Sequence, residues 1–221
     1  TGFEALLRWN HPVRGYLSPA RFIPIAEDSG LIAQIGEWAL RTACHDLAQW
    51  PEEVRVAVNV SALQFANPAL PSLIVSALSA AQVNPQRLEL EITESVFLND
   101  DAGIDAMFAA LKRVGVRLAL DDFGTGYSSL GYLKKAPFDK IKIDQSFVRN
   151  IETEAHDAAI AKMVIALGQT MGLEVIAEGV ETPAQLYFLL RNGCDQMQGH
   201  YLAKPMPPRA CAAWLQAYEQ R

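Results

Sequence analysis

The stretch RLALDDFGTGYSSLGYL, from Arg117 to Leu133, joins an apolar run to two adjacent acids and a glycine-rich turn. Leu118 to Leu120 predict a buried strand, and Asp121 and Asp122 fall at its C-terminal end. Two neighbouring carboxylates repel each other and lose hydration on burial, so this arrangement needs a neutralising partner. The stretch therefore predicts a buried strand together with a group that offsets its negative charge.

Further apolar runs repeat this pattern and alternate with helical ones. The expected strands are 3–9, 54–60, 87–93, 117–122, 140–144, 173–180 and 195–202. The expected helices are 19–30, 32–50, 71–81, 101–114, 155–171 and 183–192, and glycines follow three of them at 115, 172 and 193. This alternation predicts an α/β fold with parallel strands. A closed (β/α)8 barrel has eight strands. We therefore expect a modified (β/α)8 TIM-type barrel, either open or lacking its first strand in this fragment.

Composition bounds the class of protein. The 221 residues are 50% hydrophobic, enough for one domain over residues 1–221, and no linker or repeat divides them. The net charge of −6 argues against binding to DNA, RNA or an anionic membrane surface. The sequence contains no apolar run of membrane-spanning length, and its three scattered cysteines fit a reducing cytoplasm. Because the chain begins with Thr1 beside a strand, we expect a piece of a longer protein.

Polar side chains stand at or near the C-terminal end of every expected strand. They are Glu4, Asn59, Glu91, Glu94, Asp121, Asp122, Lys142, Asp144, Glu178, Glu181 and Gln198. In a TIM barrel these strand ends build the active site. Alternation along the strands places Glu91 and Lys142 on the face opposite the aliphatic residues. The repeated placement predicts an acidic site at one end of the barrel.

Hard divalent cations would make such a cluster tolerable, since they prefer oxygen ligands. The candidate ligands for Mg²⁺ or Mn²⁺ are Glu4, Asn59, Glu91, Asp121 and Asp122. The adjacent aspartates could each face a different ion, and one of the two carboxylates could bridge both ions. A blander interpretation stays open: a single strand-end acid is usually a solvated loop residue or a helix N-cap. Lys142 could likewise be a structural counter-ion.

The motifs FEALLRW, NVS, LEITES, DDFGTGYSSL, FDKIKIDQSFV, IAEGVET and QGHYLAKPM occur in this order along the chain. With these motifs the sequence resembles the EAL-domain family of cyclic di-GMP phosphodiesterases. The resemblance spans essentially the whole chain. It implies a modified barrel that hydrolyses one phosphodiester bond of cyclic di-GMP to linear pGpG.

The resemblance also implies roles, residue by residue. The implied metal ligands are the five named above, and Lys142 and Glu178 would hold and activate the attacking water. Arg8 would contact phosphate. Asp144, Glu181 and Gln198 would hold substrate or water, and Glu94 would anchor the loop after DDFG. Members of the family usually carry an additional helix and strand before the EAL segment, and this sequence begins after them.

Other functions remain open on the sequence alone. Some EAL-like domains bind cyclic di-GMP without cutting it, but they typically lose metal ligands or the DDFG loop, which this chain keeps. Paired carboxylates also serve glycosidases, although these strand-end acids are too many for a two-carboxylate mechanism. By resemblance we expect a homodimer. We also expect sensor or GGDEF domains elsewhere in a longer parent chain, and such parts could anchor that parent chain in a membrane.

Overall fold

The computed structural model describes residues 2–98, 102–124 and 130–218, which group into two compact units, residues 1–118 and 119–221. Both units contain parallel strands with helices between them, which confirms the predicted α/β class. Within the described ranges, no helix is both long and apolar enough to cross a bilayer.

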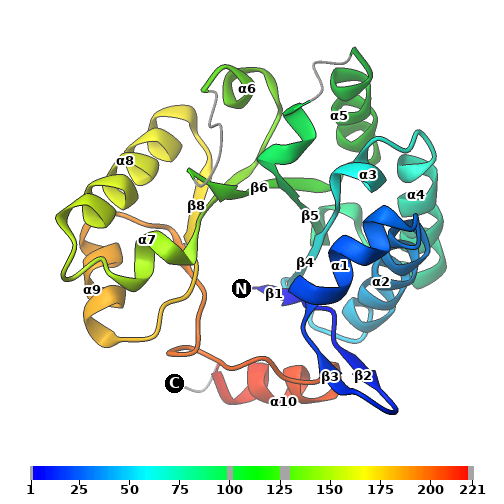
Figure 1. The fold of residues 1–221 in the computed structure, drawn as a ribbon, viewed down its shortest axis with the longest axis horizontal. Coiled ribbons are helices and arrows are strands. Elements are labelled where there is room, and N and C mark those ends of the chain that lie inside the picture. Colours follow the sequence, from blue (N-terminus) through cyan, green and yellow to red (C-terminus); the bar gives the residue numbers. More distant parts are fainter. Residues whose placement is uncertain (1, 99–101, 125–129, 219–221) are drawn as a thin grey trace. The chain divides into compact units, whose positions relative to one another are not determined.

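The first unit contains three neighbouring parallel strands. They are β1 (Gly2–Ala5), β4 (Arg55–Asn59) and β5 (Leu88–Thr93). Its helices are α1 (Pro19–Asp28), α2 (Ile32–Leu47), α3 (Ala62–Phe65), α4 (Leu70–Ala81) and α5 (Ala102–Val114), with 3-10 turns η1 (Pro85–Arg87) and η2 (Glu94–Leu98). Figure 1 shows α2 and α4 on the outer side of these strands.

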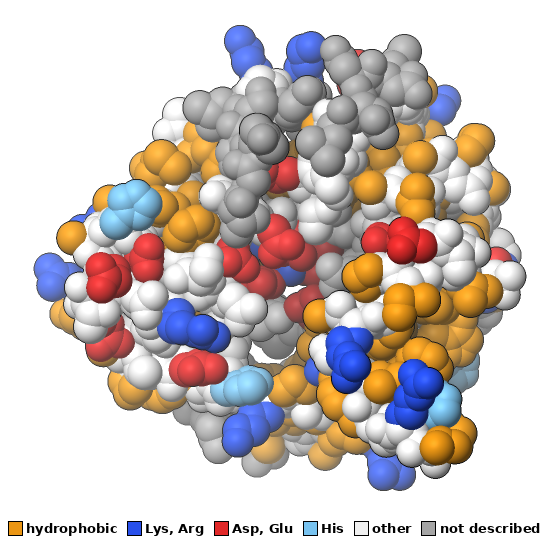
Figure 2. All heavy atoms as spheres, in the orientation of Figure 1, with side chains coloured by type: hydrophobic (Ala, Val, Ile, Leu, Met, Phe, Trp, Pro, Cys, Tyr) orange, Lys and Arg blue, Asp and Glu red, His pale blue; other side chains and the backbone are white. Residues whose placement is uncertain are grey.

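Helical periodicity explains how α2 packs in this unit. Its residues Ile32, Gly36, Leu40 and Leu47 are buried and share one face. Gly36 permits a close approach, because a Cβ there would lie 1.6 Å from the side-chain nitrogen of Gln64. The opposite face is exposed, and Figure 2 shows hydrophobic side chains at the surface over α1 and α2.

A small antiparallel hairpin follows β1, and the sequence analysis did not predict it. Its strands are β2 (Trp9–His11) and β3 (Gly15–Leu17). The expected strand 3–9 is therefore too long: β1 ends at Ala5, and Trp9 belongs to the hairpin, where its ring meets Phe22 edge-on. Nδ1 of His11 accepts two backbone N–H groups of the turn, so local hydrogen bonds shape this hairpin.

The second unit carries the other parallel strands. They are β7 (Lys140–Ile143), β8 (Glu174–Ala177) and β9 (Gln196–Met197), with β6 (Arg117–Phe123) beginning at the boundary between the units. The helices are α6 (Leu130–Lys135), α7 (Gln145–Arg149), α8 (Ala155–Met171), α9 (Pro183–Arg191) and α10 (Pro208–Tyr218). Figure 1 shows α8 and α9 outside β8.

The expected elements recur, with corrections at their ends. All seven predicted strands and six predicted helices are present. Gly115, Gly172 and Gly193 adopt the left-handed conformation expected of residues that end helices. The helices α3, α6 and α7 were not predicted because they span only four to six residues. Helix α10 was missed as well, and the expected strand 195–202 shrinks to two residues.

Arg87 gives a first prediction. Its guanidinium donates to the carbonyl oxygens of Val54, Leu47, Trp50 and Pro51 at 2.7–3.2 Å, which ties the end of α2 to the starts of β4 and β5. Arg87→Met should lower the free energy of unfolding by about 2–3 kcal/mol, because acceptors that are partly buried lose their donor. Urea denaturation measures this. Arg87→Lys should recover only part of the loss, since an ammonium cannot span four acceptors; full recovery would contradict the assignment.

The buried thiols give a second prediction. Burial raises the pKa of both Cys44 and Cys194 to about 11, so at pH 8 only about one thiol in a thousand is the reactive thiolate. Alkylation of the native protein should therefore be far slower at these two sites than in urea, where the pKa returns to about 8.5. Peptide mapping after timed iodoacetamide treatment reports each site separately. Equal rates in both states would show that the thiols are not buried.

Candidate functional site

In the first unit, predicted ligands stand at the ends of three adjacent strands. The Nδ2 atom of Asn59, after which β4 ends, donates to Oε1 of Glu4 on β1 at 2.7 Å. Glu91 on β5 lies beside Asn59 in the parallel register and is 3% exposed. The structure thus brings an amide and a carboxylate into contact and places a second carboxylate on the neighbouring strand.

Two glutamates on β5 have different surroundings. Glu89 lies two residues earlier than Glu91, is buried, and accepts from Nε of Arg117 at 3.3 Å. This ion pair offsets the charge of Glu89 inside the unit. Glu91 lies one layer closer to the C-terminal end of the strand, where the active sites of barrels are built.

Arg8 and Glu94 follow β1 and β5 in the chain. Arg8 is exposed, and its Nη1 donates to the adjacent carbonyl of Leu7 at 2.9 Å. Glu94 begins the 3-10 turn η2 and is half-buried. The loop that Glu94 is predicted to anchor, at residues 125–129, lies outside the described residues. Both roles stay predictions.

In the second unit, Asp121 and Asp122 occupy an irregularity at the end of β6. Leu120 pairs with Ile141 and Phe123 with Ile143, so two aspartates on β6 stand opposite the single residue Lys142 on β7. Such a bulge interrupts the strict alternation that would send adjacent side chains to opposite faces. Asp122 has φ +54°, a left-handed conformation that costs little only for glycine, asparagine or aspartate.

Lys142 neutralises two acids of this unit, Asp121 and Glu178. It is 1% exposed, and its Nζ lies 3.1 Å from Oδ1 of Asp121 and 2.6 Å from Oε1 of Glu178. A buried ammonium needs such partners, and the carboxylates need it equally. These two contacts are the ones expected if Lys142 is a structural counter-ion, the alternative that the sequence left open. They also hold Glu178, in the loop after β8, in one position.

The remaining predicted residues follow the strands of the second unit. Oδ1 of Asp144 accepts from the backbone N–H of Ser146 at 2.9 Å and from the Ser146 hydroxyl, so Asp144 is the N-cap of α7. Gln198 and Val180 are joined through their backbones, and Glu181 is exposed. Their predicted contacts with substrate or water stay predictions.

The donor chemistry of these strand ends fits a hard divalent cation. In the first unit, the 2.7 Å contact shows that oxygen-bearing groups of Glu4 and Asn59 come close enough to share an ion. In the second unit, Asp121 already supports one cation, the Lys142 ammonium. Over the described residues, no three His, Cys, Asp or Glu side chains form a metal-binding group by themselves. The ligand set therefore stays a prediction.

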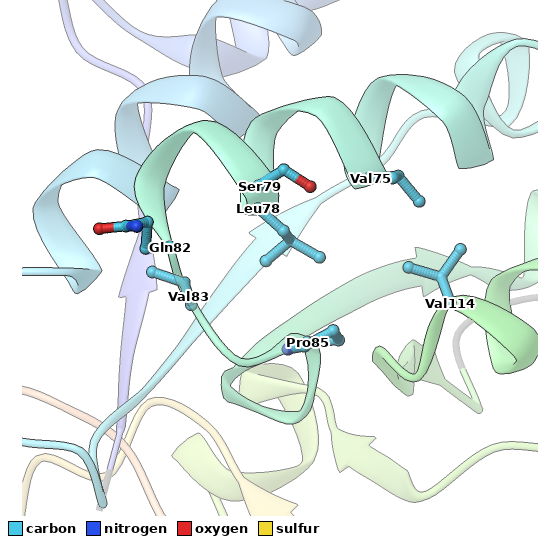
Figure 3. Close-up of a pocket in the computed structure, with 7 residues that line it drawn as sticks. All are labelled: Val75, Leu78, Ser79, Gln82, Val83, Pro85 and Val114. Carbon is cyan, nitrogen blue, oxygen red and sulfur yellow. The ribbon is translucent and has the colours of Figure 1, made fainter.

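A hollow of about 280 Å³ lies elsewhere in the first unit, between α4, η1 and α5 (Figure 3). Its lining residues include Val75, Leu78, Pro85 and Val114, and all of them are apolar or neutral. None is a predicted site residue. This surface lacks the charged groups that an anionic substrate requires, so the strand ends remain the candidate site.

Comparison with known proteins decides the family. The sequence model of the EAL domain matches residues 1–205. The chain belongs to the EAL-domain family. An uncharacterized signaling protein of Caulobacter vibrioides is 49% identical to this EAL domain over 216 residues, covering 98% of this chain and 27% of that protein.

Two further comparisons concern one relative. MucR of Pseudomonas aeruginosa, a bifunctional diguanylate cyclase/cyclic di-GMP phosphodiesterase, is 46% identical over 210 residues, covering 93% of this EAL domain and 31% of MucR. The solved complex of the PaMucR phosphodiesterase with c-di-GMP gives a TM-score of 0.90 at 45% identity, covering 94% of this chain and 86% of that chain. This likeness confirms the modified TIM-type barrel. The chain spans about a quarter to a third of these curated relatives.

Two features of the site escaped the sequence analysis. The bulge at Asp121 and Asp122 depends on pairing with β7, and no local signal in the sequence encodes it. Gln185, which is 5% exposed, belongs to a capping box with Thr182. The Thr-x-x-Gln spacing just before an apolar helix was a readable signal for that second feature.

The left-handed Asp122 gives a third prediction. Asp122→Asn should leave the free energy of unfolding within about 0.5 kcal/mol, because asparagine tolerates this conformation. Asp122→Val should lower it by about 1–3 kcal/mol, because a β-branched residue does not. Urea midpoints of the two variants measure the difference. Equal midpoints would contradict a left-handed backbone at this position.

Proposed function

We propose that this EAL domain hydrolyses one phosphodiester bond of cyclic di-GMP, giving linear pGpG in a reaction that depends on Mg²⁺ or Mn²⁺. Family membership supports the phosphodiesterase class, since the relatives include MucR and the cyclic di-GMP phosphodiesterase NbdA of Pseudomonas aeruginosa. The observation that carries the proposal is Lys142, buried between Asp121 and Glu178 at the C-terminal ends of parallel strands.

The proposed reaction adds one water across a P–O bond. The water oxygen forms a bond to phosphorus while the bond to a ribose oxygen breaks, and that oxygen leaves to become a hydroxyl. Glu178 would take the proton of the water, since its carboxylate is a hydrogen-bond acceptor fixed 2.6 Å from Nζ of Lys142. Lys142 would hold that carboxylate in place and orient the water. Arg8, exposed near the end of β1, would grip a phosphate oxygen.

The proposed ligands for one or two cations follow the family motifs. They are Glu4, Asn59, Glu91, Asp121 and Asp122. Bound Mg²⁺ or Mn²⁺ would supply positive charge that favours deprotonation of water and offsets the negative phosphate. Asp144, Glu181 and Gln198 would help to hold the substrate or water molecules. These roles follow the family motifs residue by residue.

The cellular setting forms part of the same proposal. The curated relatives are three to four times longer than this chain, which leaves room for regulatory domains in a parent protein. We propose that the domain acts in the cytoplasm on a soluble dinucleotide and lowers its concentration. A homodimer would agree with the family resemblance.

The fourth prediction is that the domain forms pGpG only in the presence of a divalent cation, which a turnover assay measures. Purified domain incubated with cyclic di-GMP and Mg²⁺ should yield pGpG by chromatography, and removing the metal with a chelator should stop the reaction. Glu4→Ala and Asp121→Asn should each lower turnover about a hundredfold or more, because each removes a proposed ligand of the cation that would offset the negative phosphate.

The control variant is Glu37→Gln, which removes a carboxylate from an exposed pair with Arg41 on α2. It should leave turnover within about twofold, since exposed ion pairs contribute little. Binding of cyclic di-GMP without product would favour the sensor function instead. Full activity in either ligand variant would contradict the metal site.

A further inference from the structure

The backbone of the loop between β8 and α9, residues 178–182, forms hydrogen bonds to two other segments, the end of β7 and residues 198–201. The backbone N–H of Glu178 donates to the Ile143 carbonyl at the end of β7 at 3.1 Å. Val180 donates to the Gln198 carbonyl and accepts from Tyr201, at 3.0 Å in each case. This loop carries Glu178, whose carboxylate meets Lys142, so its position sets that contact.

Gln185 holds the far end of the same loop with both ends of its side-chain amide. Its Oε1 accepts from the backbone N–H groups of Glu181 at 2.7 Å and Thr182 at 3.0 Å. Its Nε2 donates to the carbonyl oxygen of Arg149, at the end of α7, at 3.1 Å. Two donors on one side and one acceptor on the other allow a single orientation of the amide.

This bond to Arg149 exceeds what capping α9 requires. Thr182 caps the helix through its hydroxyl, which accepts from the backbone N–H of Gln185 at 3.1 Å. A glutamine in a capping box normally reaches back to the N-cap backbone at the surface. Gln185 is instead 5% exposed and also spans from the loop to α7.

Helix α7 in turn lies against the part of the loop that bears Glu178. A Cβ at Gly179, where φ is +69°, would lie 2.6 Å from Cβ of Gln145 at the start of α7. Asp144 caps that same end of the helix. The loop is therefore held on α7 at two places, at Gly179 by close packing and at Glu181 and Thr182 through Gln185.

We propose that Gln185 is a positioning residue for hydrolysis, which locks the 178–182 loop onto α7 and so keeps Glu178 against Lys142. The inference rests on the proposed function for its catalytic consequence. Gln185 acts through the backbone of Glu181 and Thr182. Displacing a catalytic group by about 1 Å can lower a rate about a hundredfold, so a remote amide can matter for turnover.

Two substitutions separate this role from helix capping. Gln185→Ala removes all three bonds, and kcat should fall about tenfold or more with KM changed less than about threefold. Gln185→Glu keeps an acceptor for both N–H groups but sets a carboxylate oxygen against the Arg149 carbonyl. Its kcat relative to wild type should rise as the pH is lowered, because a protonated carboxyl can donate to that carbonyl.

Thr182→Ala is the matched control. It removes the N-cap hydroxyl of the same helix, together with the bond that this hydroxyl donates to Oε1 of Glu152 at 2.7 Å, and should cost about 1–2 kcal/mol of stability. The amide bonds of Gln185 stay in place, so the variant tests whether loss of the cap and of a side-chain contact is enough to lower the rate. Its kcat should stay within about twofold of wild type. A fall as large as that of Gln185→Ala would show that the amide of Gln185 has no role beyond the general stability of this loop and helix start, and would overturn the proposal.

Hydrogen exchange supplies a readout that needs no turnover. In Gln185→Ala, the amides of Glu178 and Val180 should exchange at least about tenfold faster, although neither bonds to Gln185, while amides within β7 stay unchanged. Unchanged exchange at Glu178 and Val180 would overturn the inference even in an active enzyme. If the wild-type domain forms no pGpG, the proposed function fails, and hydrogen exchange alone decides whether Gln185 fixes the loop.

Discussion

The buried ammonium of Lys142 is the charge around which the site of the second unit is arranged. It lies 3.1 Å from Asp121 and 2.6 Å from Glu178 and is almost fully buried. Removing one member of such a group leaves uncompensated charge in a medium of low dielectric, which costs several kcal/mol. The strands that bear these residues are thus constrained by electrostatics as well as by packing. The bulge on β6, the loop after β8 and the cap of α7 all lie next to Lys142 in the chain or in the sheet.

A second constraint is the use of buried glutamines after the strands. Gln185 and Gln64 each form the far side of a capping box, with Thr182 and Ser61 as the respective N-caps. Both glutamines are buried, and both boxes begin within a few residues of predicted site groups, Glu181 and Asn59. Gly36 leaves space for the amide of Gln64, so helix packing in the first unit also preserves this arrangement. Helix starts in this protein therefore fix the loops that carry chemistry.

Much of this architecture could be predicted from the sequence, because its signals are local. Apolar runs such as Leu118 to Leu120 became strands, and glycines such as Gly115 ended helices in the left-handed conformation. The strand-end acids were predicted from their positions at the ends of apolar runs, and their roles stay predictions. The positive φ of Asp122 was not predicted, since it arises from register with β7, a long-range property. Asp144 fits the alternative interpretation of a helix N-cap, which its hydrogen bond from the backbone N–H of Ser146 shows. The hairpin after β1 shares only Trp9 with an expected strand, and hydrogen bonds to His11, which no apolar pattern signals, shape its turn.

The central claim is that strand-end oxygens of this EAL domain bind divalent cations in the presence of Lys142. Titration of the purified domain with Mn²⁺, followed by isothermal calorimetry, tests it most directly. The account predicts saturable binding of up to two ions per chain. In Asp121→Asn, at least one of these ions should no longer bind, although circular dichroism should show an intact fold. Absence of Mn²⁺ binding by the folded wild-type domain, or undiminished binding by Asp121→Asn, would contradict it.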